Sequence, residues 1–423
     1  MKIESNLQNR LALTYFILLI WPVGCLYSAL KRIEYSSFRI ILSFVGFFLG
    51  YSMTIRLNSD GSRIGQRFLE SVDLDISGFT SLIASTYTDD TVNPDFYLTT
   101  ISFLISRFSD STNFFFGILG FIYFYFFFEL YASLQKYLSV NNISIKGNFL
   151  LITAMLGICL VYPFSGGING VRFPLATFVF FCGIVSYILY KKPSSLILIC
   201  STFLIHWAFL ILVSIFFLFF VFSKFKRLTY LNILLLGTFI LSFTFLKNIN
   251  QFADFGGDAI ETKFNDYSNE NYVADRKDHF SGLNLHIQLS KTLPYYFSIL
   301  LLVIPQFARF KIKIGFKAKE MLIITYLLFI ASFILGNSID PINNRFTKLT
   351  FMASMIYLLF LYVDNKNNRT IQNLMRIYIP IAILQFYAVI RTDFEVFNVG
   401  TYFGNFFICY ILDDLPPVID IIN

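Results

Sequence analysis

Residues 113–133 read NFFFGILGFIYFYFFFELYAS, and this stretch decides the class of the fold. Glu129 is the only charged residue in it, and phenylalanine is its commonest residue. About 20 consecutive, predominantly apolar residues are enough for a helix to cross the hydrocarbon core of a bilayer. The apolar residues form a block rather than a stripe with helical or strand periodicity, which predicts a transmembrane helix.

The composition of the whole chain supports the same interpretation. Of the 423 residues, 56% are hydrophobic and only 14% are charged, whereas soluble domains carry about 25% charged residues. The five cysteines lie inside apolar blocks and lack the spacing of a metal site, so we expect neither a metal nor a cofactor. We therefore predict an all-α integral membrane protein that forms one polytopic domain over residues 1–423 and binds no nucleic acid.

The apolar blocks predict about 10–12 transmembrane helices. A last, short block at Tyr402–Leu412 is expected to enter the membrane only partly. The predicted full spans lie near Leu11–Leu30, Phe38–Ile55, Asn113–Ser133, Phe149–Phe164, Val171–Tyr190, Tyr230–Leu246, Pro294–Arg309, Met321–Gly336, Leu349–Val363 and Ile377–Ile390.

The positions of lysine and arginine predict the sidedness of the chain, because basic residues collect in cytoplasmic connections. If the spans alternate, the N-terminus starts outside and large polar loops near residues 56–111 and 247–292 face outward. Loops of this length in a compact protein are usually functional or disordered, so we expect the chemistry on the outer face. The basic clusters that then share the cytoplasmic side are Lys31-Arg32 with Arg39, Lys136 with Lys146, Lys191-Lys192, residues 224–227, residues 311–319, and Lys366 with Arg369 and Arg376.

One apolar run does not fit a single crossing. Ser194–Phe222 is continuous, but Lys191-Lys192 precedes it and the basic cluster at residues 224–227 follows it. A single crossing would place one of these clusters outside, against the positive-inside rule. We therefore predict a broken or re-entrant hairpin with His206 at its tip, in the outer half of the membrane.

A glycine-rich turn, SGGINGVRFPLA at residues 165–176, leads into the span that begins near Arg172. The start of a helix offers free backbone N–H groups and a positive dipole end, and arginine adds a planar fork suited to phosphate. We predict a diphosphate site here, with Asn169 and Gly170 as substrate contacts. The alternative is an arginine that only extends to the membrane interface.

Two further polar residues stand out against apolar surroundings. His206 is the only basic or acidic amino acid between Lys192 and Lys224, and an intramembrane histidine suggests acid–base work or phosphate contact. Arg345 follows Asn344 in a short outer turn at the head of a span, so we expect a second phosphate contact there. A hydrogen-bonded core histidine and an Arg345–Asp340 salt bridge are the respective alternatives.

The two large loops carry the remaining candidates. Asp73 and Asp75 lie in the first loop with aromatic residues such as Tyr97, and carboxylates beside aromatic rings suit sugar binding and deprotonation of an acceptor hydroxyl. Arg276 lies in the second loop and could contact sugar or phosphate. Solvated polar loops with no role in binding are the alternative for both.

Four of these stretches resemble one family. They are the acidic loop leading to Pro94-Asp-Phe-Tyr-Leu, then Gly-Ile-Asn-Gly-Val-Arg172-Phe-Pro, then Leu-Ile-His206-Trp-Ala-Phe-Leu, and finally Asn-Asn-Arg345-Phe before a span. In this order they resemble the EpsG-like branch of the Wzy O-antigen and capsule polymerases, over roughly residues 50–370. Relatives in that branch often carry glutamate where this chain has Asp95.

The resemblance implies a fold and a reaction. Wzy-type enzymes resemble the glycosyltransferase C class, in which membrane helices enclose an outward-facing cavity. On the periplasmic face of the inner membrane, the growing glycan would leave undecaprenyl diphosphate and join a new lipid-linked repeat unit. Arg172 and Arg345 would stabilise the departing diphosphate without a metal, and His206 would contact phosphate or move a proton. Asp73 or Asp75 would act as base. The implied partners are the lipid-linked donor and acceptor, the bilayer and a chain-length regulator.

Other classes of function remain open. An O-antigen ligase would use the same donor lipid with a different acceptor. A flippase or transporter for the lipid-linked oligosaccharide would be expected to carry charges within several spans, whereas these spans are nearly free of charge. A purely structural membrane protein would give no reason for outward arginines.

Overall fold

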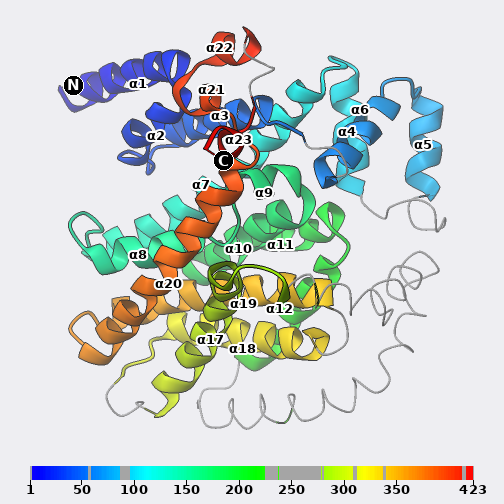
Figure 1. The fold of residues 1–423 in the computed structure, drawn as a ribbon. Helices are drawn as coiled ribbons and strands as arrows, with labels where there is room; N and C mark the ends of the chain where they lie inside the picture. The colour runs from blue at the N-terminus through cyan, green and yellow to red at the C-terminus, as the bar shows by residue number, and fades with distance from the viewer. Residues whose placement is uncertain are drawn as a thin grey trace.

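The computed structural model describes residues 2–55, 59–85, 96–223, 237, 278, 281–307, 312–336, 340–411 and 416–422. Within these ranges the chain is mostly helical, and its β pairing is confined to two isolated bridges, Met53 with Phe397 and Asn398 with Pro417. The helices, shown in Figure 1, are α1 (Lys2–Ile20), α2 (Pro22–Leu30), α3 (Ser36–Tyr51), α4 (Asp60–Glu70), α5 (Ile76–Ser85), α6 (Phe96–Ser106), α7 (Thr112–Val140), α8 (Phe149–Cys159), α9 (Phe164–Asn169), α10 (Arg172–Tyr190), α11 (Ser194–Ile205), α12 (Phe209–Ser223), α17 (Leu285–Phe307), α18 (Phe316–Gly336), α19 (Asp340–Asp364), α20 (Arg369–Phe394), α21 (Val399–Phe403), α22 (Phe406–Ile411) and α23 (Val418–Ile422).

The all-α class predicted from the sequence is confirmed, and six helical segments of the described chain are long and apolar enough to cross a membrane. Each overlaps a span predicted above. The predicted span Tyr230–Leu246 and most of the loop at 247–292 lie outside the described residues. The six segments are Thr112–Val140, Phe149–Asn169, Arg172–Tyr190, Leu285–Pro305, Arg345–Asp364 and Arg369–Phe394.

The first predicted span, Leu11–Leu30, is wrong as a single crossing. α1 ends at Ile20, and α2 begins at Pro22. The Thr14 and Ser28 hydroxyls lie 2.9 Å apart, so the two helices fold back on each other. Proline lacks the backbone N–H that a continuing helix needs, and its ring disfavours helical geometry in the preceding residue, which explains the turn. The start of α1 therefore lies at the same end as Lys31, not across the membrane from it as predicted.

The backbones of α3 and α7 lie in close contact. A side chain on Gly120 would overlap the Gly46 carbonyl oxygen, and one on Gly50 would overlap the Phe116 carbonyl oxygen. Gly46 and Gly50 form the pattern Gly-x-x-x-Gly, which lets membrane helices approach until their backbones touch. This pair holds the α3 side of the bundle together.

Basic residues from distant parts of the chain meet at one end of the bundle, here called the basic end. Lys191 Nζ lies 2.6 Å from Glu320 Oε1, which joins the end of α10 to the start of α18. Lys317 lies 4.7 Å from the Tyr137 ring, and Lys366 Nζ donates to the Asn141 carbonyl at 2.7 Å. Several clusters predicted to share one side of the membrane therefore lie together.

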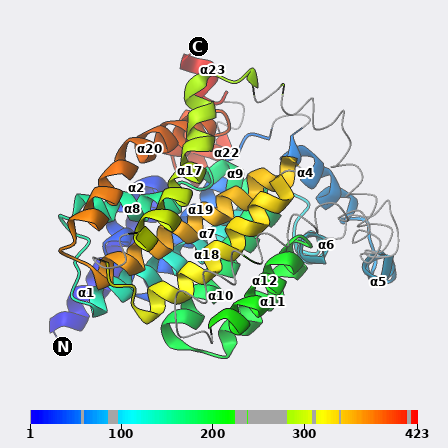
Figure 2. The same cartoon turned by 90° about the horizontal axis from the view of Figure 1, so that it is seen from below.

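The break predicted at His206 is present. α11 ends at Ile205, His206 has extended backbone angles, and α12 begins at Phe209. Ring contacts trace a hairpin alongside α10, because His206 lies 5.3 Å from Phe173 at the start of α10 and Phe220 lies 5.3 Å from Tyr187 near its end. α6 contacts α11, and Figure 2 shows α4, α5 and α6 on that side of the molecule.

Candidate functional site

The turn before Arg172 is strained. α9 occupies the glycine-rich stretch, and α10 begins at Arg172 as predicted. Val171 between them has φ +31° and ψ −57°, and the Arg172 N–H donates to the Gly170 carbonyl at 2.5 Å. The hydrogen bond has the pattern of a γ-turn, and positive φ is unusual for a β-branched residue such as valine. Strain of this kind costs about 1–3 kcal/mol and persists where the surrounding structure enforces it.

A buried carboxylate holds the other end of the same turn. Asp393 Oδ1 accepts hydrogen bonds from the Ser165 backbone N–H at 2.8 Å and from the Ser165 hydroxyl at 2.7 Å. Both residues are buried. The bonds join the start of α9 to the last turn of α20, which fixes the segment that leads to Arg172. Asp393 was not predicted from the sequence.

Two of the predicted site residues, Arg345 and His206, contact the same aromatic ring, that of Phe173. The Arg345 guanidinium carbon lies 5.3 Å from the centroid of the Phe173 ring, and the His206 ring lies 5.3 Å from the same centroid. His206 is buried, and its Nδ1 accepts from the Ala208 N–H at 3.2 Å. Phe173 follows Arg172 directly. The structure thus brings α10, the hairpin tip and α19 together at these residues.

Arg345 differs from the prediction in one respect. α19 begins at Asp340, so Arg345 lies inside the helix and not at its first turn. The apolar span does begin at Arg345, as expected, but the helix begins five residues earlier, so Arg345 does not share the dipole effect of a first turn. Its contribution to an anion site comes from its side chain and from the cations beside it.

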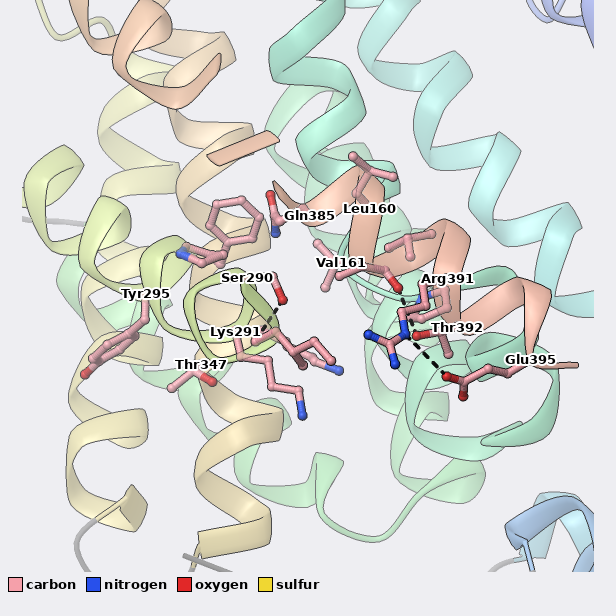
Figure 3. Close-up of a pocket in the computed structure, with 17 residues that line it drawn as sticks. Leu160, Val161, Ser290, Lys291, Tyr295, Thr347, Gln385, Arg391, Thr392 and Glu395 are labelled. Carbon is pink, nitrogen blue, oxygen red and sulfur yellow. Dashed lines mark hydrogen bonds and ion pairs between the residues drawn. The ribbon is translucent and has the colours of Figure 1, made fainter. Parts of the chain in front are cut away.

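A cavity of about 170 Å³ lies beside this cluster, between α17, α19, α20 and the turn after α8. Leu160, Val161, Pro163 and Phe351 contribute apolar wall. Figure 3 shows polar side chains from three different helices reaching the same space. The charged residues among the described lining are Lys291, Lys348, Arg391 and Glu395.

The cations of the cavity are crowded. Lys348 follows Arg345 by three residues, so both lie on the same face of α19, and Lys348 is repelled by Lys291 and by Arg345. Its ammonium lies 4.9 Å from the Tyr162 ring centroid. With three lysine or arginine residues and one carboxylate, the charged residues in the lining carry a formal net charge of +2. Such a site attracts an anion.

Arg391 occupies the centre of the wall formed by α20. Its Nη1 lies 3.4 Å from His286 Nε2 on α17, and its Nε lies 3.8 Å from Glu395 Oε1. Figure 3 shows Arg391 between Lys291 and Glu395. The cavity therefore has a cationic side on α17 and α19 and a carboxylate on the opposite side.

The two predicted loop carboxylates lie outside this cluster. Asp73 is exposed in the turn between α4 and α5. Asp75 is also exposed, and it accepts from the Ser77 hydroxyl at 2.7 Å and from the Gly78 N–H at 2.6 Å, which caps the start of α5. These bonds, the one from Ser77 first, lower the pKa of Asp75. A carboxylate held in this way is a weaker base.

The predicted substrate contacts are only partly described. Asn169 Oδ1 and Tyr97 Oη are buried, and neither has a hydrogen-bond partner within the described residues. Asn169 packs against Gly61 at the start of α4, and the Gly170 N–H donates to the Gly166 carbonyl. Arg276 and the side chain of Asn344 lie outside the described residues.

Sequence reasoning missed Lys291, Lys348 and Arg391, although the signal was present. Each follows the logic applied to Arg172, because each is a basic residue near the predicted outer end of a span. Lys348 is also close in sequence to Arg345, and a charged residue in a membrane segment suggests function by default. Within the described ranges, no three histidine, cysteine, aspartate or glutamate residues are grouped to hold a metal ion.

No family model matches the chain, and neither does any curated protein or any solved structure. The chemistry of the site therefore carries the functional inference.

Proposed function

We propose that this chain is a membrane glycosyltransferase of the Wzy type. In this proposal it transfers a growing glycan from undecaprenyl diphosphate to a new lipid-linked repeat unit, as an O-antigen, capsule or exopolysaccharide polymerase. The observation that carries the proposal is the cavity lined by Lys291, Lys348 and Arg391, one helical turn from Arg345.

The cavity suits the head of a polyprenyl diphosphate for two physical reasons. Its cations can hold a diphosphate, and charge-assisted hydrogen bonds to phosphate are about twice as strong as neutral ones. Its apolar wall and the lipid-facing helices around it suit the chain attached to that diphosphate. As the glycosidic bond breaks, negative charge grows on the leaving diphosphate, so preorganised cations stabilise the transition state more than the bound donor.

The finer architecture belongs to the same proposal. The basic end faces the cytoplasm of the cell, and the cavity faces the periplasm across the inner membrane, as the positive-inside rule favours. Lys348 and Asp364 are about 24 Å apart along α19, and this length supports the proposed arrangement because it equals most of the thickness of the hydrocarbon core. The full chain then has about 10–12 membrane helices in a glycosyltransferase C-like arrangement, with a re-entrant hairpin at His206 and large outward loops. A chain-length regulator would dock from outside.

Transfer can be measured with the purified protein in lipid nanodiscs, supplied with undecaprenyl-diphosphate-linked repeat units. We expect products longer than one repeat, resolved as a ladder. Lys348→Ala should weaken donor binding about 10- to 100-fold, because a lost charged contact is worth about 1.5–3 kcal/mol. It should not destabilise the fold, because Lys348 lies beside two other cations. Lys192→Ala, an exposed lysine at the basic end, is the matched control and should behave as the native protein.

Other products would identify the other functions. Transfer to lipid A core without a ladder would indicate a ligase. Movement of intact donor across the bilayer, with no new glycosidic bond, would indicate a flippase. Donor binding that is unchanged in Lys348→Ala would remove the cavity as the diphosphate site.

A further inference from the structure

Glu395 is placed where a carboxylate costs stability. It is the C-cap residue of the 26-residue helix α20, and the C-terminal end of a helix carries the negative end of its dipole. Cations are favoured at this position and carboxylates are disfavoured. A carboxylate retained there needs compensation from a partner or a function.

The available partners do not offset this cost. Within the described chain the ion pair of Glu395 is with Arg391, and at 3.8 Å it is too long for a hydrogen bond. Asp393, in the same turn, differs, because two short bonds from Ser165 hold it. The two carboxylates of this turn thus have different tasks. Asp393 fixes the glycine-rich turn, and Glu395 faces the cavity.

Glu395 is also the only carboxylate among the described residues that line the cavity. Arg391 lies between Glu395 and Lys291 in Figure 3, so Glu395 lies on the far side of the cavity from Lys291 and beside one of the three cations proposed to hold the diphosphate. Its side chain is 38% exposed, which gives a path for a proton to leave. A second substrate that approaches from the Glu395 side would lie between the Glu395 carboxylate, which could act as a base, and the bound donor.

We propose that the Glu395 side of the cavity binds the acceptor sugar and that Glu395 is the catalytic base. This inference rests on the proposed glycosyl transfer. The acceptor hydroxyl oxygen forms the new bond to the anomeric carbon of the donor, and the bond from that carbon to the diphosphate oxygen breaks. The proton of the hydroxyl passes to the Glu395 carboxylate, and the electron pair of the broken bond leaves with the polyprenyl diphosphate. Solvent then takes the proton from Glu395.

The test compares Glu395→Gln with Glu395→Asp in nanodiscs. Glutamine keeps the shape of the side chain but cannot accept the proton, so kcat should fall about 10²- to 10⁴-fold. Binding of undecaprenyl diphosphate itself, used as the probe, and the midpoint of thermal unfolding should stay unchanged. Aspartate keeps the carboxylate, but its shorter side chain leaves the carboxylate farther from the acceptor hydroxyl. Glu395→Asp should therefore retain more activity than Glu395→Gln. Glu34→Gln, an exposed carboxylate at the basic end, is the matched control and should be fully active.

Each result has a defined meaning. A Glu395→Gln enzyme that turns over within about threefold of the native rate would overturn the assignment while the proposed function stands. So would loss of undecaprenyl diphosphate binding in Glu395→Gln, since Glu395 would then support the donor. Equal loss in Glu395→Asp and Glu395→Gln, with a lowered unfolding midpoint in both, would show a structural role. Absence of transfer by the native protein would overturn the proposed function and this inference together.

Discussion

The two ends of the bundle differ in how their charged residues are paired. At the basic end, polar groups form short contacts between the helix ends and the segments that connect them: Lys191 with Glu320 at 2.6 Å, the Gly315 N–H with Asp364 at 2.9 Å, and Asn365 with the Lys313 backbone at 2.6 and 2.8 Å. At the cavity end, three cations share one small space with one carboxylate.

The difference separates stability from function. Short paired contacts between helices lower the energy of the fold, whereas crowded cations and a positive φ at Val171 raise it. Energy stored in this way is expected where a ligand later offsets it. Substitutions that remove one of these paired contacts at the basic end should therefore change the unfolding midpoint, and substitutions of the cavity residues should change the rate.

Among the substitutions that test this comparison, the largest effect is expected at the arginines. Arg172→Ala and Arg345→Ala should each lower the rate of transfer about 10²- to 10³-fold, by analogy with removing one preorganised donor from a transition-state site. Lysine should rescue poorly, because it lacks the planar fork. Membrane levels should stay near normal, measured by immunoblot beside the glycan ladder. A normal ladder from both alanine variants would contradict the phosphate-site interpretation.

Lys191→Met should show the reverse behaviour. Glu320 is buried, and removal of its partner leaves a carboxylate with one fewer hydrogen bond. We expect a loss of about 1–3 kcal/mol of unfolding free energy, less than for a fully buried pair because the Lys191 side chain is 44% exposed. Thermal unfolding in detergent measures this loss. The turnover rate, measured at a temperature well below the unfolding midpoint, should be unchanged. A strong loss of turnover would contradict the separation of stability at the basic end from function at the cavity end.

Val171→Gly tests whether the strained turn serves catalysis. Both glycine and alanine remove the buried valine side chain, but only glycine adopts positive φ without strain, so Val171→Gly should be more stable than Val171→Ala by up to about 1 kcal/mol after the entropy cost of glycine. The freed turn should hold Arg172 less firmly, and the rate should fall about tenfold. Val171→Ala keeps a Cβ and the strain, so it serves as control. A glycine variant that is more stable and equally fast would show that the strain has no catalytic use.

The smallest effect is expected at Asp75. Asparagine caps a helix about as well as aspartate, so Asp75→Asn should leave turnover within about twofold. A base at this position would instead lose at least about 10²-fold. Rates measured in the same nanodisc assay decide between a cap and a base. A large loss would restore Asp75 as the base and would argue against Glu395.

The sequence predicted those features of the fold that depend on residues close together in the chain. Long apolar blocks predicted the helices, and basic residues on both sides of one block predicted the break at His206. The prediction of the first span is wrong because Pro22 interrupts the helix inside an apolar run that is long enough to cross the membrane. Arg345 was identified, but its place within α19 was not, since helix ends are the least certain part of such predictions.

The rest of the site depends on contacts across the fold. Lys291, Lys348 and Arg391 belong to three different helices, and nothing in their spacing indicates that they line one cavity. Asp393 meets Ser165 across 228 positions of sequence. No local pattern could predict this pairing, because it exists only after α20 packs against α9.

The glycine contact between α3 and α7 has a consequence for biogenesis. In lipid, helices associate through close packing and not through exclusion of water, so the pair that can touch backbone to backbone has an early advantage as the chain leaves the insertion machinery. An alanine at Gly46 or Gly120 would separate the two helices before the rest of the bundle assembles. The defect would then lower the amount of protein in the membrane through quality-control proteolysis, and the few molecules that escape would keep the native activity per molecule.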